Sequence, residues 1–230
     1  MNALQEKLDF LIDKYAVDAK AVLTGAGSVE IDGTAVPLLP HRSERRLTEL
    51  KNIVNNGTLV GVSVMRTARI VEKGTDLYEV LYRELDLCQW ILQDSIRSVM
   101  AVENDSVINV IAVTEKGIVC TIEASATLAK GQEPIDKHEI ISQRGIACDV
   151  VVDAQLKQDS IYLFTDKKEK YTDVDFELYG LSASDIAVVR AAFALVQKKN
   201  YDELTAIDEN VKKLVALVKK SAKSGKKEVM

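Results

Sequence analysis

The sequence is poor in residues that interrupt or cross-link a chain, with 11 Gly, 3 Pro, 3 Cys and 2 His among 230 residues. So few glycines and prolines exclude collagen-like and low-complexity chains. No apolar run approaches the ~20 residues of a membrane helix. The termini also lack the basic-then-apolar pattern of a signal peptide. We therefore expect a globular, cytoplasmic protein with no membrane partner.

Cysteine, histidine and basic charge are too sparse for several kinds of site. Cys88, Cys120 and Cys148 are far apart in sequence and each stands among apolar residues, which predicts buried free thiols. Two histidines cannot supply a His-rich zinc site, so no metal is expected. The formal net charge of -5 is mild, and the one dense basic run is residues 219–227. We therefore expect no nucleic-acid partner.

Apolar residues recur at helical spacing in several segments. Residues 77–92 show the pattern most clearly, because Leu77, Leu81 and Leu85 form one stripe while charged residues form another. Further helices are expected near the N-terminus and in segments that Ser43, Ser182 and Thr205 would cap. The expected helices thus begin near Leu4, after Ser43, at Leu77, after Ser182 and after Thr205.

A period of two replaces the helical period over residues 96–178, after a strand-like run at residues 59–71. Short polar connections predict that neighbouring strands pair antiparallel as a meander. Residues 20–40 indicate a small hairpin or an irregular lead-in. The element order predicts an α+β fold, a broad and predominantly antiparallel sheet with helices on one face. We divide the chain into a lead-in, residues 1–42, and an α+β domain, residues 43–230.

The predicted helices can cover only one face of this sheet. The strands nevertheless carry apolar residues on both faces, as at residues 107–111 and 150–152. An uncovered apolar face of this size favours a homo-oligomer, with a dimer through the open face as the first choice. The alternative cover is the N-terminal helix, whose Leu4, Leu8 and Leu11 could lie over part of the same face.

Five segments together resemble the C-terminal domain of the glucose-fructose oxidoreductase, inositol dehydrogenase and rhizopine-catabolism (Gfo/Idh/MocA) family. The resemblance covers residues 43–230. Residues 47–61 are similar to that family's helix leading through a glycine into the first sheet strand, and residues 83–99 to the following helix and strand. The other similar segments are the hairpins at residues 115–118 and 140–146 and the ending at residues 214–226. The resemblance implies the α+β fold of that family's substrate domain.

The family's nucleotide-binding features are not found in the sequence. About 42 residues precede the matched region, where the family has a Rossmann domain. Gly25 and Gly27 do not form a G-x-G-x-x-G turn within a βαβ unit. The family's Glu-Lys-Pro motif is also absent, since Leu8 follows Glu6 and Lys7. We therefore expect no bound NAD(P) and no cofactor of another kind.

The family's proton-transfer position is changed as well. The resemblance places that family's Asp-x-x-x-His motif at Glu79 and Arg83. An arginine stays protonated and cannot act as a base. Two interpretations of Glu79 and Arg83 remain: an exposed helix ion pair, or an arginine retained to bind a carboxylate or phosphate.

Three further residues are considered as site candidates. His41 and Arg42 fall where the family's substrate cleft has its floor, and the alternative is a solvated loop. His138 alternates with Ile140 in a predicted strand, which favours a hydrogen-bonded sheet histidine over a catalytic one. The candidate ligand-binding residues are therefore His41, Arg42, Glu79 and Arg83, with no catalytic residue assigned.

Two functions follow from the resemblance and these departures from it. The first is a non-catalytic or partner-dependent homologue of the family's substrate and oligomerisation domain, without autonomous dehydrogenase activity. The second is a subunit of a split NAD(P)-dependent sugar or polyol oxidoreductase whose Rossmann domain is a separate protein. In either case a sugar-like small molecule is the expected ligand.

Overall fold

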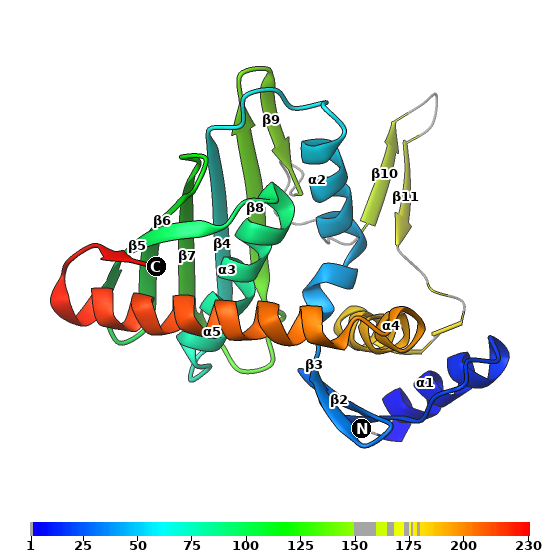
Figure 1. The fold of residues 1–230 in the computed structure, drawn as a ribbon. Coiled ribbons are helices and arrows are strands. Elements are labelled where there is room, and N and C mark those ends of the chain that lie inside the picture. The colour runs from blue at the N-terminus through cyan, green and yellow to red at the C-terminus, as the bar shows by residue number, and fades with distance from the viewer. Residues whose placement is uncertain (1, 150–159, 165–167, 173–174, 176, 179) are drawn as a thin grey trace. The chain divides into compact units, whose positions relative to one another are not determined.

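The computed structural model describes residues 2–149, 160–164, 168–172, 175, 177–178 and 180–230, and Figure 1 shows its elements. The chain folds into two compact units. Unit 1 comprises Met1–Leu47 and Ala154–Asp208, and unit 2 comprises Thr48–Asp153 and Glu209–Met230. This division differs from the predicted one at residues 42/43, because the segment from residue 154 to residue 208 groups with the N-terminal segment.

Unit 1 contains helices on a small antiparallel sheet. Its elements are α1 (Asn2–Lys14), β1 (Ala21–Gly25), β2 (Ser28–Ile31), β3 (Thr34–Pro37), the short 3-10 helix η1 (Pro40–Ser43), the hairpin β10 (Ser160–Phe164) and β11 (Lys168–Thr172), and α4 (Ala183–Lys198). The core joins α1, the sheet and α4, and Leu8 and Leu11 are buried in it. The apolar stripe of α1 therefore packs in the core of unit 1.

Unit 2 is built on a seven-stranded mixed sheet in the order β12-β5-β6-β7-β4-β8-β9. Its strands are β4 (Val64–Glu72), β5 (Ile96–Glu103), β6 (Val107–Thr114), β7 (Val119–Leu128), β8 (Ile135–Ser142), β9 (Gly145–Cys148) and β12 (Glu228–Val229). All neighbours pair antiparallel except β4 and β7, which are parallel. The predicted α+β class and mostly antiparallel sheet are confirmed.

The simple meander is wrong at two places. β4 lies between β7 and β8, so these consecutive strands do not pair with each other. β10 and β11 form a separate hairpin rather than extending the large sheet. The predicted strand residues 150–152 lie outside the described residues.

α3 (Leu77–Leu92) begins and ends where the sequence predicts. The Asp76 carboxylate accepts a hydrogen bond from the Tyr78 backbone N–H, and Gln93 closes the helix with a φ of 48°. Its apolar stripe packs on the inner face of the sheet, where Ile108, Ile122 and Ile140 are fully buried.

One predicted cap and one predicted helix start differ in the structure. α2 (Arg45–Asn55) begins after Ser43, which belongs to η1 and does not cap it. α5 (Tyr201–Ser224) begins before Thr205, whose hydroxyl donates to the Tyr201 carbonyl inside the helix. The predicted Ser182 cap of α4 is confirmed, because its hydroxyl accepts a hydrogen bond from the Asp185 N–H.

Cys148 is exposed, so the prediction of three buried thiols holds only for Cys88 and Cys120.

One face of the unit 2 sheet is covered by α3 and the C-terminal half of α5, as Figure 1 shows. The Ser221 hydroxyl of α5 accepts a hydrogen bond of 3.0 Å from the Ala101 N–H. The opposite face, here called the open face, carries exposed apolar side chains: Met100, Val102, Ile111, Ile135 and Ile146. Among the described helices, none has the length and apolar character needed to cross a membrane.

Candidate functional site

A network of buried charged side chains lies between α3 and the inner face of the sheet in unit 2. Alternate residues of a strand point to one face, so Asp136 and His138 of β8 both point toward α3. Arg69 stands opposite Asp136 on the neighbouring strand β4. The six members of this ionic network are Arg69, Arg83, Glu84, Asp136, His138 and Asp149.

His138 joins two carboxylates at the centre of the ionic network. Its Nδ1 lies 2.7 Å from Asp149 Oδ2, and its Nε2 lies 3.1 Å from Glu84 Oε2. The His138 backbone N–H also donates to Asp149 Oδ1 at 2.7 Å. The His138 side chain has no solvent exposure. The predicted hydrogen-bonded sheet histidine is therefore what the structure contains.

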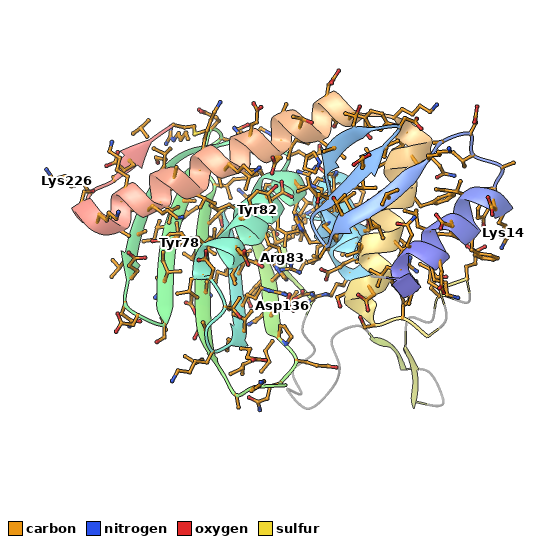
Figure 2. All side chains as sticks on the ribbon, turned by 90° about the horizontal axis from the view of Figure 1, so that it is seen from below. Lys14, Tyr78, Tyr82, Arg83, Asp136 and Lys226 are labelled. Atoms are coloured by element: carbon orange, nitrogen blue, oxygen red, sulfur yellow. The ribbon has the colours of Figure 1, made fainter. Side chains whose placement is uncertain are left out.

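Asp136 joins two arginines at the other end of the ionic network. Its Oδ2 accepts from Arg69 Nη1 at 2.7 Å and lies 3.1 Å from Arg83 Nη2. Arg83 also forms an ion pair with its neighbour Glu84. Figure 2 shows Arg83 of α3 directed toward Asp136. A continuous chain of ion pairs therefore runs from Arg69 to Asp149.

The charges in the ionic network shift two pKa values strongly. Burial by itself would lower the pKa of His138, but the nearby Glu84 charge and the hydrogen bonds to Asp149 and Glu84 raise it to about 9. Burial would raise the pKa of Glu84, but Arg83 and His138 hold it well below its ordinary value. His138 is therefore a cation at neutral pH, and Glu84 is an anion.

This arrangement is unsuited to proton exchange with a substrate. Both ring nitrogens of His138 face carboxylates, and a protonated imidazole cannot accept a further proton. Arg83 stays protonated at any working pH. The cations and carboxylates of the ionic network balance one another, as buried charges require.

The structure separates the two predicted residues of α3. Glu79 is exposed, whereas the Arg83 side chain is 12 % exposed and pairs with Glu84 and Asp136. The exposed-ion-pair interpretation is therefore wrong for Arg83, because its guanidinium lies in the buried ionic network. The guanidinium pairs with two carboxylates of this chain, and the alternative, an arginine retained to bind a ligand carboxylate or phosphate, stays a prediction.

His41 and Arg42 lie in η1 of unit 1. His41 is only 6 % exposed, and Arg42 is half-buried. The solvated-loop interpretation is therefore wrong, because Pro40–Ser43 forms a 3-10 turn that packs on α4. Their predicted role in ligand binding stays a prediction.

Sequence reasoning missed four members of the ionic network: Arg69, Glu84, Asp136 and Asp149. Two of them have a local signal. Glu84 interrupts the apolar stripe between Leu81 and Cys88, and Asp136 shares the inward alternation of His138. A charged residue at such a position indicates a buried ion pair. Within the described part of the chain, no group of three or more His, Cys, Asp or Glu side chains could hold a metal ion.

Comparison with known proteins finds likeness in structure alone. No family model and no curated protein matches the sequence. The scyllo-inositol dehydrogenase from Lactobacillus casei, solved with NAD(H) and scyllo-inositol, matches with a TM-score of 0.61 at 12 % identity over 83 % of this chain. An oxidoreductase domain protein from Kribbella flavida matches with a TM-score of 0.61 at 14 % identity, also over 83 % of this chain.

The matches cover only part of these proteins. The chain spans 63 % of the Lactobacillus casei enzyme and 64 % of the Kribbella flavida protein. Identities this low establish the fold and no activity. The resemblance seen in the sequence is thus confirmed at the level of the fold: the chain has the α+β fold of the C-terminal domain of Gfo/Idh/MocA dehydrogenases.

Proposed function

We propose that this chain is a non-catalytic or partner-dependent counterpart of the substrate and oligomerisation domain of these dehydrogenases, located in the cytoplasm. The observation that carries the proposal is the pairing of Arg83 with Glu84 and Asp136. The resemblance places a titrating histidine at this position in the family. Here the position holds a permanent cation in a buried ionic network, so the family's proton transfer has no acceptor.

The chain by itself is expected not to bind NAD(H) or NADP(H). Gly25 and Gly27 lie at the β1–β2 turn of a three-stranded antiparallel sheet, which is not the βαβ setting of a dinucleotide site. Titration calorimetry with each reduced cofactor should give no saturable heat. A dehydrogenase that carries its Rossmann domain serves as the positive control. A micromolar Kd for either cofactor would contradict the proposal.

A second function is a subunit of a split sugar or polyol oxidoreductase. It is favoured by the neighbour that was solved with NAD(H) and scyllo-inositol, of which this chain spans 63 %. A separate Rossmann-domain protein would then supply the cofactor and the catalytic groups. The two functions are distinguished by mixing the chain with such a partner and a polyol. NAD-dependent oxidation that appears only in the mixture would favour the split enzyme.

Assembly through the open face is part of the proposed function. Ile111 of β6 is 51 % exposed there, next to Met100 of β5. The same face also carries charges, since Arg66 pairs with Glu139 at 3.3 Å. The alternative cover by α1 is disfavoured, because Leu8 and Leu11 are buried in the core of unit 1. A second copy of the chain is therefore the proposed partner.

The substitution Ile111→Glu is expected to dissociate this dimer. A two-fold axis places a residue at the centre of the interface close to its own copy, so two carboxylates would be buried without partners. Light scattering behind a sizing column should give twice the 25.4 kDa chain mass for the wild type and a single chain mass for the variant. Val22→Glu, at an exposed valine of β1 in unit 1, is the matched control and should remain dimeric. A wild-type mass of one chain at micromolar concentration would refute the dimer.

A further inference from the structure

A cleft of about 390 Å3 lies between α3 and α5, wholly within unit 2. Figure 2 shows Tyr78 and Tyr82 along the part of α3 that runs beside α5. No member of the buried ionic network lines the cleft. Its lining residues are the cap residue Asp76, then Tyr78, Glu79 and Tyr82 from α3, and Lys212, Val215, Ala216 and Lys219 from α5.

The middle of the cleft is apolar and has one fixed wall. Val215 and the small Ala216 contribute aliphatic surface opposite the tyrosine rings. The Tyr78 hydroxyl donates to Glu103, and Lys219 Nζ lies 4.4 Å from the centroid of the Tyr78 ring. These two contacts hold the Tyr78 ring in place. An apolar or aromatic group of a ligand therefore has a preformed surface on which to pack.

The two walls of the cleft carry opposite charges. Glu79 lies on the α3 wall, and Lys212 and Lys219 lie two helical turns apart on the α5 wall. Neither Glu79 nor Lys219 forms an ion pair with any side chain in the described part of the protein. A ligand with one charge of each sign would match both walls, whereas a neutral polyol would use neither charge.

We propose that this cleft binds a small zwitterion with an apolar side group, namely a free α-amino acid of the phenylalanine or leucine type. Its ammonium group would face Glu79, its carboxylate would face Lys219, and its side group would pack on Tyr82 and Ala216. The cavity is large enough for such a molecule, since small-molecule sites span roughly 300–1,000 Å3. This inference goes beyond the assembly role and does not depend on the dimer.

Binding of L-phenylalanine to the full chain tests the proposal. Calorimetry or NMR titration should give a saturable Kd at least tenfold tighter than for 3-phenylpropanoate, which lacks the ammonium group, or phenethylamine, which lacks the carboxylate. Glu79→Gln keeps the side-chain shape, and should weaken binding about tenfold because a charge-assisted hydrogen bond is lost. Lys219→Ala should weaken it similarly. Lys223→Ala removes an exposed lysine of α5 that does not line the cleft and should leave the Kd unchanged.

Ala216→Trp fills the cleft and should abolish binding, with urea denaturation showing that the variant is folded. If it does not fold, Glu79→Gln decides the question, because the Glu79 side chain is exposed. The proposal is overturned if phenylalanine shows no saturable binding at concentrations up to about 10 mM. This concentration is high enough to detect a Kd in the millimolar range. Equal affinity for 3-phenylpropanoate, tighter binding of inositol, or an unchanged Kd in Glu79→Gln would each overturn it too.

Discussion

Replacing Glu84 with alanine is expected to lower the free energy of unfolding by about 3–5 kcal/mol. The Glu84 side chain is fully buried and contacts Arg83 on one side and His138 on the other. Without the Glu84 carboxylate, Arg83 keeps only its ion pair with Asp136, and His138 keeps only its ion pair with Asp149. Breaking a buried ion pair on one side is costly because the remaining charge stays out of water without its partner.

Urea denaturation at pH 7, followed by circular dichroism, measures this effect. Glu79→Ala on the same helix is the matched control, and it should change the free energy of unfolding by less than about 1 kcal/mol because Glu79 is exposed. Glu84→Gln should fall between the two, since an amide keeps one hydrogen bond but not the charge. A loss below about 1 kcal/mol for Glu84→Ala would show that the ionic network contributes little to stability.

The second large effect is a fall in stability as the pH rises through about 9. The pKa of His138 is raised from 6.5 to about 9 in the folded protein, so the folded state binds this proton more tightly than the unfolded state. The resulting stabilisation is complete below about pH 6.5 and is lost as the pH passes the folded pKa. The shift corresponds to a contribution on the order of 3 kcal/mol.

His138→Gln isolates this contribution. Unfolding free energies of both proteins, measured from pH 6 to 9.5, should converge toward high pH, because the wild type loses the imidazolium there and the variant never has it. Burial and a hydrogen bond to Glu103 raise the pKa of Tyr78 to about 12, so its own effect lies above pH 10. Cys88, whose pKa is also raised, is common to both proteins. Parallel curves over the whole range would show that His138 is not protonated in the fold.

Local patterns predicted the elements of this protein whose ends depend on nearby residues. The helix at residues 77–92 has the predicted bounds because its apolar stripe, the Asp76 cap and the left-handed Gln93 lie within one segment. The Ser182 cap is equally local, since its hydroxyl needs only the N–H of Asp185. The alternation of β6, β7 and β8 likewise follows from pleating, which places every second residue in the core.

Strand order and the ionic network were decided only in the tertiary structure. β4 pairs parallel with β7 and separates it from β8, and no local turn signal specifies a pairing between strands so distant in sequence. Glu84 and His138 are 54 residues apart, and they meet because α3 packs on the inner face of the sheet, toward which the His138 side chain of β8 also points. The sequence by itself determined that residue 83 is an arginine and cannot be a base. Whether that arginine faces water or buried carboxylates depended on which strand lies beneath α3, and the adjoining strand β8 presents Asp136 there.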